Sequence, residues 1–439
     1  MRHFPYYLQL AWRSLWRSPG LTMLMVVTIG FGVGACMTTW SVFQAASGDP
    51  IPDKSERLFV PQMDIWRSAA RSADGEPLDA LTYTDAVALM RDHRAVRQSA
   101  VYPIAPSVFP DRAGQHPATV GGYAVSGEFF PMVDMPFLYG QGWNAADDAA
   151  AAPVVVLGRA LNDKVFGGVN SVGRSLDIGG RDYRVVGVVD DWNPQPAFYD
   201  VFDTGGYTHE GPALFMPFTR AIAANLANGR TACDLEPSAP GFPGLQQSDC
   251  AWITYLAELD TPAQVQAYRV YLDAYAAAQR RAGRFLGPPN NRLRDLPAFL
   301  DAERVVPGDT RVSFLVALGL LLVCLINTVG LLLAKFLRRS GEIGVRRALG
   351  AARSAIYAQF LIESAMVGLA GGAFGLLLTG LGVLGIGAVL QPRLAALARL
   401  DGRLLLATLA VAVLCTVLAG LYPSFRAARV QPAWQLKSD

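Results

Sequence analysis

Long apolar runs alternate with stretches of mixed polarity along the chain. Four runs come close to or exceed the roughly 20 residues that a helix needs to cross about 30 Å of hydrocarbon. They cover residues 21–46, 312–337, 356–390 and 404–422. Residues 47–311, between the first two runs, are polar enough to fold in water. The pattern predicts an α-helical membrane protein with four transmembrane helices and one large water-exposed domain between the first and the second.

Residues 1–20 predict an amphipathic helix that lies on the inner membrane surface. Apolar side chains recur there at helical spacing, and tryptophan favours the level of the lipid headgroups. Arg13 and Arg17 fall on the opposite side of this helix. The apolar side comprises Leu8, Ala11, Trp12, Leu15 and Trp16.

The water-exposed domain mixes helical and strand patterns. Thr82 and Thr261-Pro262 are typical helix starts, and residues 153–157 and 181–189 are short apolar runs typical of buried strands. Helices interleaved with strands favour an α+β fold. Residues at about 190–260 are rich in glycine and proline and give little regular signal, so we expect an insertion there.

Basic residues indicate which segments face the cytoplasm. They cluster in residues 1–20, 338–355 and 423–439, which the positive-inside rule places inside the cell. Both termini are then cytoplasmic, and residues 47–311 lie outside. The hairpin at 391–403 would also lie outside. Its three arginines argue mildly against this membrane topology. A cleaved signal peptide is the alternative for the N-terminus, but the first apolar run is about twice as long as the core of such peptides.

The composition and the missing motifs argue against an enzyme. Mean hydropathy is +0.26 and 17% of residues are charged, more apolar and less charged than is usual for a soluble enzyme. Only four lysines occur and none follows a glycine, so these residues contain no Walker A loop of the form GxxxxGK[ST]. The four histidines form no HExxH motif and no zinc-type spacing with cysteine, and GxSxG is absent. We expect no catalytic residue, no metal site and no cofactor, with any ATP bound by a partner.

The five cysteines divide by position. Cys36, Cys324 and Cys415 fall in predicted spans, where cysteine usually serves as a small apolar residue. Cys233 and Cys250 are the two cysteines in the external segment. We expect a disulfide between them, because the compartment outside the membrane is oxidising. Two free thiols are the alternative.

Polar residues within the spans admit two interpretations. Asn327, Thr328, Glu363 and Ser364 could mark a substrate path, because polar groups are costly in lipid. No span carries the series of charges that an ion or proton relay needs, which favours a structural role. In that role Asn327 makes an interhelical hydrogen bond and Glu363 lies at the inner headgroup level within reach of arginines.

Glycine spacing predicts close helix packing. Gly30 and Gly34 in the first span have the small-xxx-small spacing that lets a neighbouring helix approach, and the third span is glycine-rich. The third-span glycines expected to pack are Gly368, Gly371, Gly372 and Gly375.

The stretch between the second and third spans resembles the signature of FtsX-like ABC transporter permeases. It reads GEIGVRRALGA at 341–351, followed by QFLIES at 359–364 and a glycine-rich span. Residues 119–189, with VSGEFF, GQGW and VVGVV, look like the periplasmic core of the MacB-type subgroup, and YPSFRAAR at 422–429 resembles the family's C-terminal tail.

This resemblance implies a multi-pass permease of the bacterial inner membrane that works as a homo- or heterodimer with a cytoplasmic ABC ATPase. Macrolide-exporter permeases carry the ATPase ahead of the first span; none precedes it here, so we expect a separate ATPase chain. A periplasmic adaptor protein is a further candidate partner. The resemblance also implies a coupling helix within 338–355 that seats in the ATPase. Its expected residues are Glu342, Gly344, Arg346, Arg347 and Gly350, although anchoring of the arginines on anionic lipid is the alternative.

The function expected from the resemblance is mechanical. ATP-driven dimer closure would move the external domains, which export amphipathic substrates such as peptides and antibiotics. Two alternatives share the architecture. One is a lipoprotein-releasing permease, and the other is a regulatory module that moves no substrate and controls a periplasmic cell-wall hydrolase.

Overall fold

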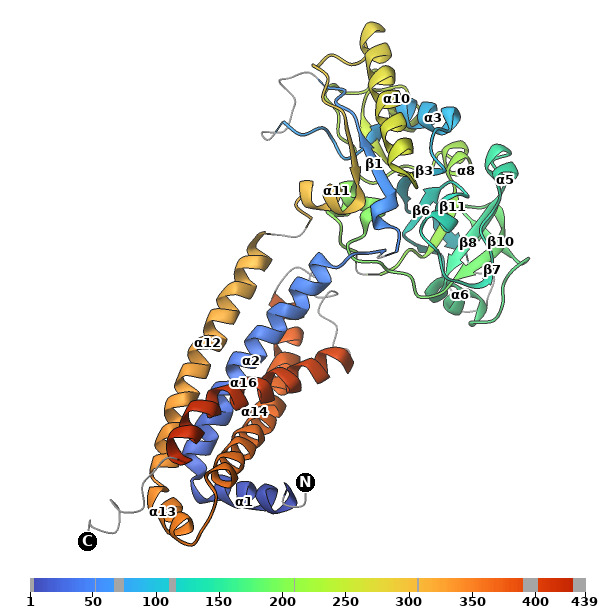
Figure 1. Cartoon of the computed structure of the whole chain (residues 1–439). Coiled ribbons are helices and arrows are strands. Elements are labelled where there is room, and N and C mark those ends of the chain that lie inside the picture. The colour runs from blue at the N-terminus through green and yellow to red at the C-terminus, as the bar shows by residue number, and fades with distance from the viewer. Residues whose placement is uncertain are drawn as a thin grey trace. The chain divides into compact units, whose positions relative to one another are not determined.

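The computed structural model describes residues 4–51, 53–66, 75–109, 116–208, 210–305, 308–389 and 402–428. The chain forms two compact units (Figure 1). The helical unit comprises Met1–Ala46 and Pro307–Asp439, and the α/β domain comprises Ser47–Val306. A domain inserted after the first long helix is the organisation that the hydrophobic pattern predicts.

Four helices of the helical unit are long and apolar enough to cross a membrane. They are α2 (Pro19–Ser47), α12 (Gly308–Leu337), α14 (Arg353–Val389) and α16 (Gly402–Ala428). The predicted fold class, four apolar helices with a large domain between the first and second, is confirmed. Helix α16 continues past residue 422 through Pro423. Most of the predicted hairpin at 391–403 and the end of the predicted tail at 423–439 lie outside the described residues.

Two shorter helices complete the helical unit: α1 (Phe4–Arg17) and α13 (Ser340–Ala348). In α1, Trp12 and Trp16 are 57% and 71% exposed, which suits side chains at headgroup level. Ala11 and Ser14, in contrast, are buried. Helix α1 therefore packs against other helices along one face, and Ala11 belongs to that packed face and not to the exposed apolar side where its spacing placed it.

Helix α14 packs through glycines on two faces. A Cβ at Gly368 or Gly372 would meet α16, 2.9 Å from Val413 Cα in the first case and 3.0 Å from Ala412 Cβ in the second. On another face, a Cβ at Gly371 would lie 2.9 Å from Ile29 Cγ2 of α2. Gly375 faces Gly30, and Gly34 faces Leu378. All six glycines singled out in the sequence lie at close helix contacts.

The α/β domain is built on a mixed sheet, of which thirteen strands lie in the described residues. The strand order is β13-β1-β12-β3-β6-β11-β8-β10-β9-β4-β5, with β2 paired to β12 and β7 to β10. Strand pairs β10–β8 and β11–β6 are parallel, and the other pairs are antiparallel. The strands are β1 (Leu58–Gln62), β2 (Leu81–Thr82), β3 (Arg97–Ile104), β4 (Ser107–Phe109), β5 (Ala118–Thr119), β6 (Gly122–Val125), β7 (Phe137–Gly140), β8 (Val154–Gly158), β9 (Ser175–Ile178), β10 (Asp182–Val189), β11 (Leu214–Pro217), β12 (Ala251–Glu258) and β13 (Arg292–Asp295).

The helices of this domain begin at recognisable caps. Thr82 accepts a hydrogen bond from Asp85 N at the start of α3, and Thr261 forms a capping box with Gln264 at the start of α10, where Pro262 occupies the first turn. Both starts were predicted from these residue types. The helices are α3 (Tyr83–Asp92), α4 (Phe129–Met132), α5 (Ala145–Ala149), α6 (Arg159–Phe166), α7 (Val201–Thr204), α8 (Phe218–Ala223), α9 (Gly241–Gln246), α10 (Pro262–Arg281) and α11 (Leu296–Ala302), with 3-10 turns η1 (Ser55–Arg57) and η3 (Phe198–Asp200).

The expected insertion at about 190–260 does not hold as a whole. Strand β11 lies between β6 and β8, and β12 lies between β1 and β3, so this stretch supplies two interior strands of the sheet. Every residue of both strands is buried. Burial on both faces removes the alternation of apolar and polar residues by which a strand is detected in a sequence.

Cys233 and Cys250 form a disulfide that closes the loop leading into β12. Cys250 is fully buried, directly ahead of the buried strand. Closing a loop of this length restricts the unfolded chain. In the loop-entropy model this raises the free energy of unfolding by about 3 kcal/mol.

Replacing both disulfide cysteines by serine should therefore lower the free energy of unfolding of the α/β domain by about 3 kcal/mol. Denaturant unfolding followed by tryptophan fluorescence measures this loss, with reduced wild-type protein as the control. Peptide mapping without reductant should recover Cys233 linked to Cys250. Recovery of both as alkylated thiols from unreduced protein would contradict the prediction.

Candidate functional site

Helix α13 occupies the short connection between the second and third long helices. Helix α12 ends at Leu337 and α14 begins at Arg353, so few residues remain on either side of α13. The chain leaves α13 through Gly350, whose φ of 94° is a backbone conformation that other residues rarely adopt. In the described ranges, no atom beyond the adjoining residues lies within 4 Å of a Cβ at Gly350. The backbone conformation, and not lack of space, therefore requires glycine there.

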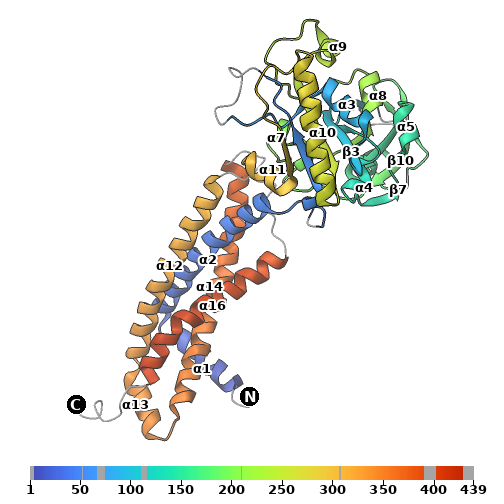
Figure 2. The same cartoon turned by 45° about the horizontal axis from the view of Figure 1, so that its top comes forward.

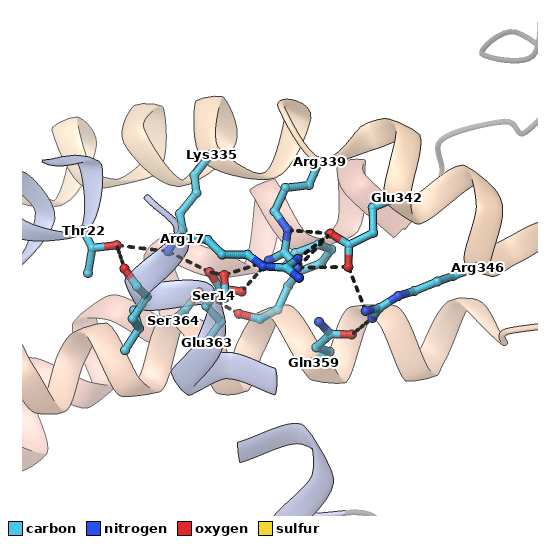
Figure 3. Close-up of polar contacts among 12 residues, drawn as sticks. Ser14, Arg17, Thr22, Lys335, Arg339, Glu342, Arg346, Gln359, Glu363 and Ser364 are labelled. Carbon is cyan, nitrogen blue, oxygen red and sulfur yellow. Dashed lines mark hydrogen bonds and ion pairs between the residues drawn. The ribbon is translucent and has the colours of Figure 1, made fainter. Parts of the chain in front are cut away.

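Glu363 of α14 is the centre of a buried polar cluster beside this connection (Figure 3). Lys335 Nζ lies 2.8 Å from Glu363 Oε1, and Arg339 Nη1 lies 3.2 Å from Glu363 Oε2. Ser14 of α1 donates a hydrogen bond to Glu363 Oε1 at 2.5 Å and accepts one from Arg339 at 2.7 Å. Lys335 also donates to Thr22 Oγ1 of α2 at 3.3 Å. One carboxylate thus connects α1, α12 and α14 with the residue that precedes α13.

Burial makes this cluster sensitive to the loss of any member. The side chains of Lys335 and Glu363 are 2% and 0% exposed. Removing an ion from water costs several kcal/mol, and close partners must compensate that cost. Each oxygen of Glu363 is paired with a cation. The buried carboxylate therefore keeps all its partners only when Lys335, Arg339 and Ser14 hold their places.

Glu342 extends the cluster into α13 itself. Its carboxylate lies 3.2 Å from Arg339 Nη2, 2.7 Å from Arg346 Nη2 and 3.5 Å from Arg17 Nη1 of α1. Arg346 in turn donates to Gln359 Oε1 of α14 at 3.1 Å. The polar residues of α13 therefore fasten it to α1 and α14 within the same chain (Figure 3).

The two faces of α13 differ in exposure. Ile343 is buried with Phe336 and Phe360 in one apolar cluster of the helical unit, and Gly344 is buried beside it. Val345 and Leu349 are 57% and 83% exposed. An exposed apolar face on a short helix held by several ion pairs is suited to binding another protein.

The structure divides the coupling residues named from the sequence into three groups. Glu342 and Arg346 lie together in the ion-pair network, whereas Gly344 and Gly350 serve packing and the turn. Arg347, the third, is half-buried. The expectation that Glu363 lies within reach of arginines is confirmed by Arg339. Sequence reasoning did not connect Ser14 and Lys335 with Glu363, and it overlooked the outward position of Val345 and Leu349. The amphipathic spacing of α13 was the available signal for the last two.

The other intramembrane polar residues differ in their surroundings. Thr328 donates to Cys324 O at 2.8 Å and Ser364 donates to Phe360 O at 3.0 Å, both within their own helices. Asn327 is exposed on α12, and its side chain makes no interhelical hydrogen bond, as was expected of it, to any residue that the structure describes. In the described part of the chain, no group of three or more histidine, cysteine or acidic side chains could hold a metal ion.

Comparisons with known proteins place these features in context. The MacB-like periplasmic core domain matches residues 22–275, and the FtsX-like permease C-terminal region matches residues 314–432. The Pyoverdine export ATP-binding/permease protein PvdT of Pseudomonas entomophila (strain L48) is 25% identical over 447 residues, covering 98% of this chain and 59% of that protein. The Macrolide export ATP-binding/permease protein MacB of Agrobacterium fabrum (strain C58 / ATCC 33970) is 26% identical over 445 residues, covering 98% of this chain and 60% of that protein.

A solved structure also aligns with the chain. The periplasmic region of MacB from Actinobacillus actinomycetemcomitans is 12% identical, with a TM-score of 0.36, and the alignment covers 57% of this chain and 94% of that one. The chain spans 59% and 60% of the length of the two sequence relatives.

Proposed function

The chain belongs to the family of ABC transporter permeases that combine a MacB-like periplasmic core domain with an FtsX-like C-terminal region, and on this premise we propose that it exports amphipathic substrates by mechanical coupling to an ABC ATPase. The observation that carries the proposal is the buried cluster around Glu363. It fastens α13, which has an exposed apolar face, to three helices of the unit.

The mechanism we propose uses α13 as the seat of the ATPase. Movement of the ATPase would push on Val345 and Leu349, and the ion pairs of Glu342 and Arg339 would pass the force to α1 and α14. A flexible attachment would dissipate the force, whereas the buried pair of Arg339 with Glu363 resists displacement. The chain itself joins α2 and α12 to the two ends of the α/β domain, so motion of these helices reaches that domain.

The ATPase of this proposal is cytoplasmic and lies outside the 439 residues. The 439 residues contain no Walker A loop, and the two relatives described above are named ATP-binding/permease proteins. Dimerisation of the permease, as a homodimer or a heterodimer, and a periplasmic adaptor protein are parts of the same proposal. Asn327 offers support for dimerisation, because a second copy would remove an exposed amide from lipid.

The proposed location is the bacterial inner membrane, with both termini in the cytoplasm and the α/β domain in the periplasm. The basic clusters on either side of α13 and before α2 support this orientation. The disulfide of the α/β domain also suits an oxidising compartment.

The ATPase seat can be tested at its apolar face. Replacing Leu349 by glutamate should weaken ATPase binding at least about tenfold, because an exposed apolar anchor is replaced by a charge that must be desolvated. Pull-down of the partner ATPase and permease-stimulated ATP hydrolysis in nanodiscs measure the loss. Leu349→Met, which keeps the apolar contact, is the matched control and should behave as the wild type. If the glutamate variant bound the ATPase as tightly as the wild type, α13 would not be the binding site of the ATPase.

A further inference from the structure

The α/β domain contains a large cavity that is separate from the cluster around α13. Its volume is about 750 Å³, within the range of roughly 300–1,000 Å³ typical of small-molecule sites. Helices α3, α5 and α8 lie near one another in both views (Figures 1 and 2). Residues of all three helices line the cavity. The apolar part of its lining is formed by Tyr83, Val87, Met90, Trp143, Phe218 and Ile222.

Aromatic packing holds the cavity walls in place. Tyr83 stacks on Phe218 and on Trp252 of β12, each with 6.3 Å between ring centroids. Trp143 meets Phe130 edge-on at 4.7 Å, and only 5% of it is exposed. Walls fixed in this way form a preformed site, so binding would require little ordering of side chains.

Asp148 of α5 places a carboxylate without a cationic partner at this apolar cavity. Its Oδ1 accepts a hydrogen bond from Trp143 Nε1 at 2.8 Å, and its Oδ2 accepts one from Gly127 N at 2.7 Å. No ion pair joins it to any cation in the described ranges, and burial raises its pKa to about 6. Each oxygen retains a lone pair that can accept a further hydrogen bond.

The other charged groups in the lining are already paired. His93 Nε2 lies 2.9 Å from Glu128 Oε1, and Gln98 N donates to Glu128 Oε2 at 2.7 Å. The guanidinium of Arg91 pairs with Asp92 at 3.1 Å, and its side chain is 75% exposed. Asp148 is therefore the charge in the cavity that a ligand would meet without displacing a partner.

We propose that this cavity binds an amphipathic cation. The apolar body of the ligand lies against Tyr83, Trp143 and Phe218, and its ammonium or guanidinium group donates hydrogen bonds to Asp148. This inference extends the proposed export function by specifying the charge of the substrate, and it rests on that function only for the step from binding to export. Binding itself requires neither ATP nor α13.

The test uses the full chain in lipid nanodiscs and a fluorescent probe, monodansylcadaverine, which carries an apolar dansyl ring and a primary ammonium. Its matched neutral analogue is N-pentyl dansylamide, and empty nanodiscs supply the background for partition into lipid. We expect saturable binding of one cationic probe per chain, at least about tenfold tighter than that of the neutral analogue. Equal affinity for the two probes would overturn the proposal.

Two variants locate the binding site. Asp148→Asn should weaken binding of the cationic probe at least about tenfold and leave binding of the neutral analogue unchanged. Asp147→Asn, on the same helix but outside the cavity lining, should alter the affinity for neither probe. Val87→Trp fills the cavity from a position that is already 37% exposed, so the domain should still fold, and it should abolish saturable binding of the cation. Wild-type binding by both Asp148→Asn and Val87→Trp would place the probe elsewhere and refute the site.

Acidification supplies an independent readout. As pH falls from 7.5 to 5, Asp148 should take up its proton near pH 6 and the cationic probe should lose affinity. His93, Glu128 and Arg91 also line the cavity, so the informative quantity is the part of the pH dependence that Asp148→Asn removes. If Asp148→Asn removes none, the carboxylate is not the cation's partner. Probe binding as described without any effect of ATP on probe release would leave the site standing and count against export.

Discussion

Replacement of Glu363 by alanine is expected to abolish the proposed coupling to an ATPase and to lower the free energy of unfolding of the helical unit by about 3–5 kcal/mol. The reason is that Lys335, which is 2% exposed, and Arg339 would remain at a buried site without their common carboxylate. Ser14 would also lose the acceptor of its hydrogen bond. Unfolding of detergent-solubilised protein and permease-stimulated ATP hydrolysis measure the two effects.

Two further variants separate this effect from a general loss of charge. Glu363→Gln keeps an acceptor for Ser14 and should fall between alanine and the wild type. Glu342→Gln removes a carboxylate that is 33% exposed and should cost less than about 1 kcal/mol of stability, because solvent screens its ion pairs. If Glu363→Ala were no less stable than Glu342→Gln, the cluster would not hold the helices together.

The second large effect is expected at Gly368, where a single methyl group should disrupt the packing of α14 on α16. The Cβ of an alanine there would lie 2.9 Å from Val413 Cα and 3.0 Å from Ala412 O, both backbone atoms that cannot rotate away. Gly368→Ala should therefore lower the free energy of unfolding by about 1–3 kcal/mol, the range for overpacked interiors. The helices must separate to accept the added atom.

Gly330 of α12 provides a control with the opposite sign. Apart from its own helix backbone, no atom of the described residues lies within 4 Å of a Cβ at this position, so Gly330→Ala meets no obstacle among them. Alanine favours the helix over glycine by about 1 kcal/mol, and we expect a small gain in stability. Unfolding of both variants in the same detergent measures the contrast. Equal effects at the two positions would show that helix propensity, and not packing against α16, decides stability at Gly368.

Several parts of the protein were accessible from the sequence because each depends on residues close together in the chain. The length of an apolar run determines whether a helix can span a membrane, so four spans and the position of the intervening domain followed directly. Threonine before Pro262 and before α3 marked two helix starts through local capping. The glycine spacing in α2 and α14 indicated close packing, since residues four apart lie on one face of a helix.

Strands β11 and β12 could not be recognised in the same way. Their residues are buried on both faces, so no alternation of polar and apolar positions distinguishes them from a loop or a buried helix. Their places inside the sheet depend on pairing with β6, β8, β1 and β3, which are distant in the chain.

The sequence by itself determined the four apolar helices, the insertion of the α/β domain after the first of them, and the charged, glycine-containing stretch that includes α13. The sequence placed Glu363 within reach of arginines, but only the tertiary structure decided that this arginine is Arg339 and that Glu363 also holds Lys335 and Ser14, which is 349 positions away. The tertiary structure also decided that Glu342 and Arg346 face inward while Val345 and Leu349 face outward. The physical reason is that a sequence pattern records which face of an element avoids water, whereas the identity of the partners depends on how separate elements pack.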